Sequence, residues 1–467
     1  MNTTLGVIFG NRDFFPDHLV SEARRDILAL FQEMKIDGVM LEEQDTKLGS
    51  VETYAHAKAC AELFKASRER IVGILVVLPN FGDEKGVADT IKLSGLNVPI
   101  LVQAYPDDLE AFNVERRRDA FCGKVSVCNN LRQYGYDFTL TSLHTSKPLS
   151  DSFKKDLAKF ASVCHVVKGL RSARLGAIGA RPGAFNTVRY SEKILQATGI
   201  TVTTVDLSEI LGNSNRLNDD APQVKAKLDE IHAYAKHDTV PSPAIVRMAK
   251  LGVVISDWMQ ANDIQATALQ CWTSLQKNYG INACTLMSMM SNQLMPSACE
   301  TDITGVVSMY ALQLASDSPG ALVDWNNNYA DDPDRCVLFH CGNWAKSFIP
   351  DIEIKTAPIL GTTLGEENTY GAMAGRAVAG PMTYARVSTD DVNGIVRAYT
   401  GQGELTNDPL DTFGHRAVVH TQDLQKLLAY LCKSGFEHHV AMTMGSVSDA
   451  LDEAFTTYMG WENYRHS

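Results

Sequence analysis

The sequence predicts an α/β fold in which two successive parallel-sheet domains precede a region of antiparallel strands. Apolar, strand-sized segments alternate with amphipathic helical segments from the N-terminus, and the same alternation restarts near residue 169. After about residue 320, short strand-like segments follow one another without helices between them. Continuous apolar strands separated by helices are typical of parallel sheets covered on both faces. The length of 467 residues, at roughly 150 residues per domain, suggests about three domains.

The first predicted domain, residues 1–168, carries polar residues directly after its first strand. We expect its strands and helices in the order 5–10, 16–35, 37–42, 51–70, 71–79, 83–95 and 98–105. Parallel sheets bind ligands at the carboxyl ends of their strands, which draws attention to Asn11 and Arg12. The glycine-rich dinucleotide fingerprint is missing there, because the loop reads GNRDFFP, and no Walker A motif occurs in the chain. A nucleotide-binding role for this domain therefore loses its main support.

The second domain, residues 169–319, repeats the pattern with strands at 174–180 and 265–270 and a long helix at 242–262. Its segment GARPGAF (179–185) fits either a Gly/Pro turn or an anion site at a helix N-terminus. The third domain, residues 320–467, has strand-like segments with many glycines, typical of an antiparallel barrel or sandwich. Helices return at about 422–434 and 447–460.

Composition argues against several classes of partner. The net charge is −12 and no basic run interrupts the acidic balance, so we expect binding neither to nucleic acid nor to a membrane surface. No apolar run approaches the roughly 20 residues that span a bilayer. The N-terminus shows no features of a signal peptide, and the ten scattered cysteines contain no C-x-x-C pair. These features predict a cytoplasmic protein without a disulfide framework or a cysteine-based zinc site.

Four residues with ligating side chains lie at the ends of apolar runs or inside them: Glu300, Asp324, His340 and His439. Unpaired charges and imidazoles are costly in such places, and a shared divalent cation would compensate all four. Two carboxylates and two imidazoles suit six-coordinate Mn²⁺, Co²⁺ or Fe²⁺ better than a closed structural zinc site. Each residue alone also fits a structural role, as a hydrogen-bonded core histidine or, for Glu300, as a helix cap.

At these four residues the sequence resembles the superfamily of L-fucose isomerase and L-arabinose isomerase, which are metal-dependent aldose–ketose isomerases. The order Glu, acidic residue, His, His is similar to the arabinose isomerase pattern, and the intervals are 24, 16 and 99 residues. The His438-His439 pair before a strand is the most specific match. Asp324 resembles the fucose isomerases, whereas His340 is closer to the arabinose isomerases, and the loop GNRDFFP looks most like fucose-isomerase-like proteins. The likeness extends over essentially the whole chain.

This resemblance implies two Rossmann-like domains, 1–168 and 169–319, the second carrying Glu300. A C-terminal β-barrel domain with terminal helices, 320–467, would carry Asp324, His340 and His439. The implied cofactor is Mn²⁺ or another divalent cation such as Co²⁺, Fe²⁺ or Mg²⁺, bound by these four residues. The implied reaction isomerises an open-chain sugar through a cis-enediol.

The resemblance also assigns roles. Glu300 and Asp324 would be both metal ligands and the acid/base pair, and His438 would orient substrate. Asn11 and Arg12 would bind sugar, reaching the active site of a neighbouring subunit in a homo-oligomer, a hexamer or a smaller ring. Trp325 and Trp344 flank the ligands and would supply either an apolar face for the sugar or core packing.

Two other functional classes remain open from the sequence. Successive α/β domains also occur in non-catalytic sugar-binding proteins, although the missing signal sequence and the third domain weigh against that class. An epimerase or aldolase would begin with the same proton abstraction. The sugar itself, whether a pentose, a 6-deoxyhexose or a hexose modified at C6, is not predicted; an acidic C6 group would call for a cation such as Arg12, Arg181, Arg189 or Arg386.

Overall fold

The computed structural model describes residues 2–467, and the chain separates into two compact units. The first unit runs to Lys168 and includes Thr456–Gly460, and the second comprises Gly169–Phe455 and Trp461–Ser467. The boundary falls inside helix α5 (Asp151–Arg171). Among the described residues, no helix combines the length and apolar character that crossing a membrane requires.

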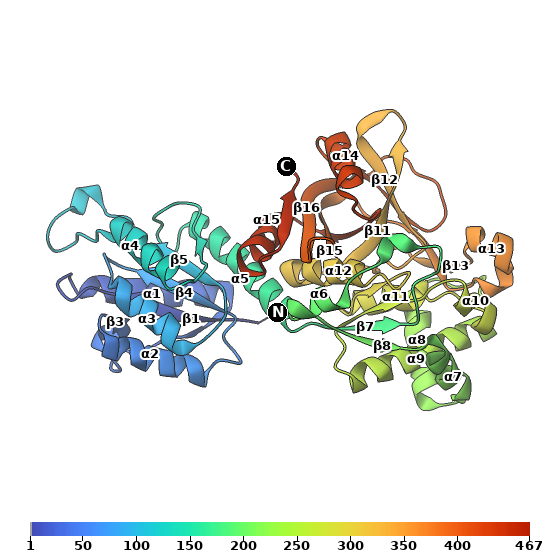
Figure 1. Ribbon diagram of the computed structural model, residues 1–467, viewed down its shortest axis with the longest axis horizontal. Helices are drawn as coiled ribbons and strands as arrows, with labels where there is room; N and C mark the ends of the chain where they lie inside the picture. Colours follow the sequence, from blue (N-terminus) through green and yellow to red (C-terminus); the bar gives the residue numbers. More distant parts are fainter. Residues whose placement is uncertain (1) are drawn as a thin grey trace. The chain divides into compact units, whose positions relative to one another are not determined.

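The first unit is built on a parallel sheet, as the sequence predicts (Figure 1). Its strand order is β2-β1-β4-β5-β6, and β3 also pairs with β1. Every residue of the three central strands is buried, so helices and loops cover the sheet on both faces. The strands are β1 (Thr3–Gly10), β2 (Ile36–Val39), β3 (Ser50–Val51), β4 (Gly73–Leu78), β5 (Ile100–Ala104) and β6 (Thr139–Leu140).

Local capping signals fix the helices of this unit. At α3, the Asp83 side chain accepts a hydrogen bond from the amide of Gly86 at 2.6 Å, and Gly95 ends the helix with φ +62°. Thr53 caps α2 in the same way. The helices are α1 (His18–Met34), α2 (Tyr54–Ala66), α3 (Glu84–Ser94), α4 (Ala120–Gln133) and α5, with short 3₁₀ turns at Lys47–Gly49 and Leu109–Ala111.

The second unit contains a smaller parallel sheet of order β10-β9-β7-β8. Its strands are β7 (Arg174–Ile178), β8 (Thr201–Val205), β9 (Ala266–Leu269) and β10 (Ser297–Ala298). The helices of this part are α6 (Glu192–Ala197), α7 (Leu207–Arg216), α8 (Pro222–Tyr234), α9 (Ser242–Ala261), α10 (Ser274–Tyr279), α11 (Cys284–Asn292) and α12 (Ile303–Ser316). A 3₁₀ turn lies at Asn186–Val188.

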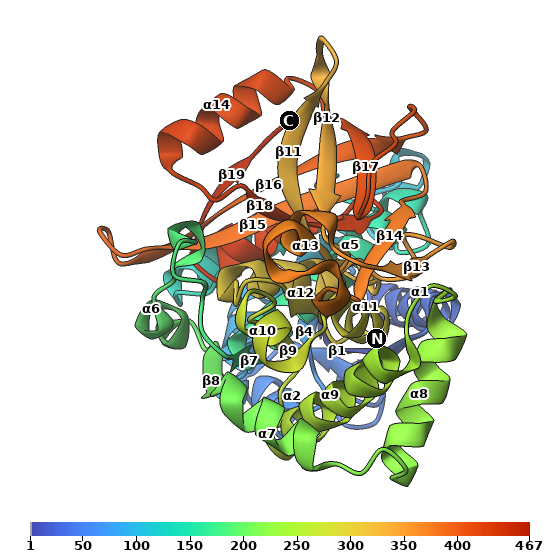
Figure 2. The ribbon, with the colours of Figure 1, turned by 90° about the vertical axis from the view of Figure 1, so that its right-hand side faces the viewer.

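The second unit also contains a nine-stranded sheet of order β13-β14-β17-β12-β11-β18-β15-β16-β19, with an additional β16–β17 pairing (Figure 2). Its strands are β11 (Ala321–Tyr329), β12 (Asp332–His340), β13 (Glu353–Lys355), β14 (Ala372–Arg376), β15 (Gly380–Asp390), β16 (Ile395–Thr406), β17 (His415–His420), β18 (His439–Met444) and β19 (Glu462–Arg465). Its helical segments are α13 (Pro358–Leu364), a 3₁₀ turn at Glu366–Asn368, α14 (Leu424–Ser434) and α15 (Ser448–Glu453). A π-helical turn at Ala454–Tyr458 follows and runs across the boundary between the two units.

This sheet is mixed, which corrects the prediction of purely antiparallel strands. Most neighbours are antiparallel, but β14 pairs with β17 and β16 pairs with β19 in parallel. Parallel pairing requires a long crossover connection, and residues 407–461 provide one between β16 and β19. Because β14 and β19 are short, their sequences carry no pattern that reveals the direction of pairing.

Helix α12 links the two sheets of the second unit. It contacts β9 on one side and β15 and β18 on the other, and almost all of its residues are buried. A helix that is apolar all round belongs in a core. The residues just before α12 are thereby held between the parallel sheet and the mixed sheet.

Candidate active site

Three strands and one connection of the second unit bring the sequence-predicted ligands together. Glu300 lies in the tight connection between β10 and α12, and Asp324 lies in the middle of β11. Asp324 pairs in register with His439, the first residue of β18, and on its other side with Phe339, the residue before His340. Strand pairing therefore joins residues that are more than 100 positions apart in the chain.

His439 has a defined protonation geometry. Its Nδ1 lies 2.8 Å from Oδ2 of Asp302, a carboxylate that can only accept when ionised, so Nδ1 carries a proton. The other ring nitrogen, Nε2, lies 3.4 Å from Oδ1 of Asp324 and 3.8 Å from Oε2 of Glu300. In the neutral ring, a bare nitrogen therefore faces two acceptor oxygens. A cation between these atoms, or a second ring proton, would relieve this clash of lone pairs.

The carboxylate oxygens that face His439 lack hydrogen-bond partners. Oε2 of Glu300 and Oδ1 of Asp324 are both buried atoms that accept no hydrogen bond. Burying an unsatisfied carboxylate oxygen is costly, and a bound cation is a common compensation. Suitably spaced donor atoms that include His439 come in two overlapping groups: Glu300, His340 and His439 form one, and Asp324, His438 and His439 form the other.

The remaining oxygen of Glu300 is held in place. Oε1 accepts a hydrogen bond from the indole nitrogen of Trp272 at 2.9 Å and a weaker one from the Cys271 thiol at 3.4 Å. Glu300 and Thr301 both have left-handed backbone conformations, with φ of 56° and 55°. Successive residues of this kind store strain, which clusters at functional sites. Burial raises the pKa of Glu300, but His340 and His439 lower that pKa more, so the carboxyl is ionised at neutral pH.

His340 lies 3.6 Å from Glu300 through its Nε2. Its Nδ1 accepts a hydrogen bond from the Cys341 amide at 3.0 Å and also lies 3.5 Å from the Cys341 sulfur. Because Nδ1 accepts this hydrogen bond from the Cys341 amide, the proton of a neutral ring lies on Nε2, which would then donate toward Glu300. Coordination by Nε2 requires the other tautomer, with Nδ1–H directed at the sulfur. Burial lowers the pKa of His340, but the neighbouring Cys341 and Glu300 raise it to a net value well above the ordinary one.

A buried ion-pair network holds His439 from behind. Asp302 accepts from Arg386 at both carboxylate oxygens, at 2.5 and 3.0 Å, and caps α12 through the amide of Gly305. Arg386 also donates to Glu437 at 3.3 Å. Burial raises the pKa of Asp302, but Arg386 and His439 lower that pKa by more than burial raises it, so the net pKa lies well below its usual range. Because Arg386 is fully buried and engaged, it is not available to bind an acidic substrate group.

A cavity of about 270 Å³ opens onto these residues. Its walls are mainly apolar and aromatic, from Phe185, Phe339, Ile359, Leu360 and Phe413. Phe185 belongs to the GARPGAF segment, and its ring lies 5.4 and 5.5 Å from the rings of His438 and His439. The cavity has the character of a small-molecule site, with apolar walls and a few convergent polar groups.

His438 lies at the exposed side of the candidate metal ligands Glu300, Asp324, His340 and His439. Its Nε2 is 3.7 Å from Oδ1 of Asp324, and its side chain is 42% exposed, whereas that of His439 is 2% exposed. Burial and the neighbouring His439 lower the pKa of His438, so the ring is neutral near pH 7. This position fits contact with a substrate better than a fixed structural role.

The two tryptophans flanking the ligands do not line this cavity. Trp344 is completely buried in the core and donates through Nε1 to the carbonyl of Leu322 at 2.8 Å. Trp325 donates to the hydroxyl of Tyr399 at 3.0 Å and packs against Tyr384. Their contacts are those of core packing, and our proposal for the site does not include them.

Asn11 and Arg12 lie in the first unit, at the carboxyl ends of its strands. Asn11 is buried and hydrogen-bonds with Asn80 and Glu52. Arg12 pairs with Glu84, donates to the Gly82 carbonyl, and stacks over Phe81 with its guanidinium carbon 4.4 Å from the ring centre. The loop that follows β1 thus contacts the loop that follows β4, at residues 80–82, while a role of Asn11 and Arg12 in sugar binding stays a prediction.

The sequence patterns did not reveal the supporting roles of Asp302, Arg386, Cys271 and Trp272, although Arg386 was a candidate for binding an acidic C6 group. A signal existed only for Asp302, which follows Glu300 by two residues in CETDITG. An acidic residue directly before an apolar helix is usually a cap, and Asp302 does cap α12. Its second role, binding Arg386 and His439, depends on the packing of β15 and β18 beside it.

Comparison with known proteins identifies the family. Residues 6–171 match the model described as fucose/sulfoquinovose isomerase, N-terminal domain, and residues 338–466 match L-fucose isomerase, C-terminal domain. Sulfoquinovose isomerase from Priestia megaterium (strain ATCC 12872 / QMB1551) is 24% identical over 344 residues, covering 72% of this chain and 74% of that protein. Sulfoquinovose isomerase from Clostridium sp. (strain MSTE9) is 23% identical over 339 residues, with the same coverage.

Among solved structures, an ABC transporter periplasmic solute binding protein from Actinobacillus succinogenes 130z with bound D-allose is 10% identical to this chain. The match covers 68% of this chain and 93% of that one, but its TM-score of 0.17 supports no conclusion about fold or function. The two family models and the curated relatives, by contrast, agree with one another. They show that the chain belongs to the L-fucose isomerase-like family and is an aldose–ketose sugar isomerase.

Proposed function

We propose that this isomerase depends on a divalent cation and converts an open-chain aldose into a ketose through a cis-enediol. The observation that carries the proposal is the arrangement around His439. Its Nε2 and two partnerless carboxylate oxygens, from Glu300 and Asp324, face one another across 3.4 and 3.8 Å. Such atoms repel each other unless a positive charge lies between them.

The residues present fit a divalent cation. Glu300, Asp324 and His439 would hold it, and His340 would complete the set in the tautomer that donates to Cys341. Two carboxylates with imidazoles suit Mn²⁺, Co²⁺, Fe²⁺ or, with fewer nitrogen ligands, Mg²⁺. When bound, the cation would supply Lewis-acid stabilisation of negative charge on the sugar oxygens.

The protein's own groups would move the proton. Shifting a carbonyl from C1 to C2 requires removal of the C2 proton and delivery of a proton to C1. Glu300 is ionised and oriented by Trp272, and Asp324 borders the cavity, so these carboxylates are placed to take up and return the proton. We propose Glu300 and Asp324 as the acid/base pair.

The apolar walls of the cavity would protect the reaction from water. Phe185, Phe339 and Phe413 shield the carboxylates, which strengthens electrostatic interactions around a developing enediolate. His438, neutral and partly exposed, would hydrogen-bond a sugar hydroxyl and help to set the orientation of the chain. These side chains would position substrate without taking part in the chemistry.

The end of the sugar distant from the carbonyl would meet an uncharged part of the cavity. No Lys or Arg lines the cavity among the described residues of this unit. The curated relatives are named sulfoquinovose isomerases, and a sulfonate in this chain would need a cation from outside the cavity. We propose Arg12, in the loop that the family resemblance assigns to sugar binding, as that cation in a neighbouring subunit.

We also propose that the nine-stranded sheet contains the barrel that the sequence predicts. The additional pairing of β16 with β17 supports it. Neighbouring strands pair in the order β17-β12-β11-β18-β15-β16, and the β16–β17 pairing joins the two ends of this series. We also propose the division into domains 1–168, 169–319 and 320–467, because the strands of these three ranges form three separate sheets. It places Glu300 in one domain and the other ligands in the next.

A panel of aldoses in D₂O, followed by proton NMR with added Mn²⁺, tests the proposed function. The panel should include pentoses, 6-deoxyhexoses and sulfoquinovose. Ketose product carrying solvent deuterium at C1 would support an enediol route. Formation of a C2 epimer without ketose would favour an epimerase, and cleavage of the carbon chain would favour an aldolase. Ketose in which the hydrogen from C2 of the substrate has moved entirely to C1, without any solvent deuterium, would contradict proton exchange with the carboxylate pair.

A further inference from the structure

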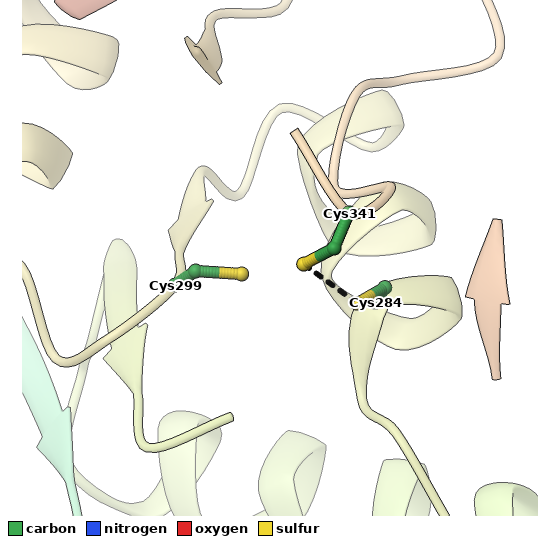
Figure 3. Close-up of side chains that lie close together, drawn as sticks. All are labelled: Cys284, Cys299 and Cys341. Atoms are coloured by element: carbon green, nitrogen blue, oxygen red, sulfur yellow. Dashed lines mark hydrogen bonds between the residues drawn. The ribbon is translucent and has the colours of Figure 1, made fainter. Parts of the chain in front are cut away.

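Three cysteines converge in the second unit beside the candidate active site, although their sequence spacing gives no hint of it. Cys284 is the first residue of α11, Cys299 follows β10, and Cys341 follows β12. Their sulfur atoms all lie within 4.8 Å of one another, and those of Cys284 and Cys341 are 3.5 Å apart. Figure 3 shows the three side chains pointing toward a common space from separate elements. All three are free thiols.

We propose that Cys284, Cys299 and Cys341 form a second metal site, which takes a soft d¹⁰ cation such as Cu⁺, Zn²⁺ or Cd²⁺. Metal–sulfur bonds of about 2.3 Å place the sulfurs of a trigonal site about 4 Å apart. The observed spacing needs adjustments of less than about 1 Å to reach that geometry. Soft thiolate donors select this class of cation over the hard cations that carboxylates prefer.

The surroundings match the same class of ion. The sulfur of Met287 lies 3.8 Å from that of Cys299, which adds a soft thioether to the cluster. Cys284 is the first residue of the nine-residue helix α11, so its position is fixed by a regular element. Each coordinating thiol would release its proton to solvent, and no oxidant or reductant is required.

The site has an entry path. Cys284 and Cys299 are almost completely buried, whereas Cys341 lines the cavity described above and is partly accessible from it. Of the three sulfur atoms, that of Cys341 is the one that a cation in the cavity would contact first. The carboxylate–imidazole cluster borders the same cavity, so a test must separate sulfur ligands from oxygen and nitrogen ligands.

Cadmium titration of the full-length protein provides that separation. The protein is stripped with chelator, kept reduced with a phosphine, and titrated with Cd²⁺ while the ultraviolet sulfur-to-cadmium charge-transfer absorbance is recorded. We expect this absorbance to saturate at one Cd²⁺ per chain. Both Cys284→Ser and Cys299→Ser should lose most of it. Cys336→Ser, which changes a buried cysteine of β12 outside the cluster, should keep it in full.

Two further measurements keep the proposal open to contradiction. Glu300→Gln, which removes an oxygen donor of the other cluster, should retain the charge-transfer absorbance. In the wild-type protein, ¹¹³Cd NMR should show a resonance in the strongly downfield range typical of several thiolate ligands, a result that needs no variant to fold. If wild-type protein shows only oxygen- and nitrogen-bound cadmium, or if the absorbance keeps its full size in both cysteine variants, these residues are core cysteines and the proposal is wrong.

Discussion

Oδ2 of Asp302 lies 2.8 Å from Nδ1 of His439, and the same carboxylate is bound to Arg386. This relationship fixes which nitrogen of His439 carries the proton and leaves Nε2 directed at Glu300 and Asp324. Hydrogen bonds of this kind orient metal-binding histidines and increase their basicity. Asp302 is therefore the residue through which the buried ion pair influences the proposed metal site.

Replacing Asp302 with Asn should weaken binding of Mn²⁺ by roughly 10- to 100-fold. The neutral amide of Asn would replace the charged carboxylate that accepts the hydrogen bond from Nδ1 of His439. Asn is also a good helix cap, so α12 should still form. Isothermal titration of the metal-free protein with Mn²⁺ measures the effect.

The matched control for this variant is Glu437→Gln. Glu437 accepts a hydrogen bond from the same Arg386 at 3.3 Å and another from Ser388, so it contacts these two residues rather than His439. Its loss should lower stability without a comparable loss of Mn²⁺ affinity. Equal losses of Mn²⁺ affinity in both variants would mean that Asp302 acts on the fold in general and not through His439.

Glu300→Gln and Asp324→Asn should each lower kcat by at least about 100-fold, as expected for groups that transfer a proton. Steady-state kinetics at saturating Mn²⁺, with occupancy measured on the same samples, would test this. Glu367→Gln, which changes an exposed carboxylate near α13, serves as the control and should remain active. Near-normal kcat at full occupancy in either site variant would assign that residue a structural role.

Lys124 gives the first unit a defined alkaline pH dependence. Its buried ammonium donates to Oγ1 of Thr141 at 2.6 Å and to the carbonyl of His144 at 2.9 Å, and burial lowers its pKa to about 8. An unfolded lysine has a pKa of about 10.4. Below pH 8 both states are protonated; between these values the unfolded state binds more protons, so the free energy of unfolding rises with pH.

The variant Lys124→Met should lack this rise. We expect the free energy of unfolding of the wild-type protein to gain on the order of 2 kcal/mol relative to the variant between about pH 8 and pH 10.4. Hydrogen exchange of β4 and β5 amides, followed against urea, reports on this unit. Lys85→Met, at an exposed position of α3, should follow the wild type. Identical pH dependence in wild type and Lys124→Met would contradict the prediction.

We expect a closed homo-oligomer in which the Asn11–Arg12 loop contributes to a neighbour's site. Analytical ultracentrifugation tests the assembly, and a fully active monomer would refute it. Mixing inactive Arg12→Ala subunits with inactive Glu300→Gln subunits tests the shared site, since sites built from two chains regain some activity. No recovery despite demonstrated subunit exchange would show that the loop serves its own chain or no site.

Much of the parallel-sheet architecture could be predicted because it depends on local patterns. The strands β1, β4 and β5 are continuous apolar runs, and covered parallel sheets require such runs. Helix α4 was missed because its buried residues include Gly123 and Lys124, which leave no clean apolar stripe. The parallel pairing of β14 and of β19 was not predicted, because strands this short do not encode the direction of their partners.

The candidate ligands could be selected from the sequence, but their surroundings could not. Asp324 and His439 were identifiable as polar groups in apolar runs, and only strand register makes them neighbours. The convergence of Cys284, Cys299 and Cys341 depends on three separate elements packing together, which residue spacing does not report. Support from Arg386 has the same origin, because β15 places that side chain behind the site.

The central claim is that aldose–ketose isomerisation by this protein requires a divalent cation held by Glu300, Asp324 and His439. The most direct measurement compares activity with metal content, determined by elemental analysis, as stripped enzyme is reloaded with Mn²⁺. The account predicts negligible isomerisation by the stripped enzyme and a recovery proportional to the Mn²⁺ bound, up to one ion per chain. Full activity in enzyme shown to be free of metal would contradict it.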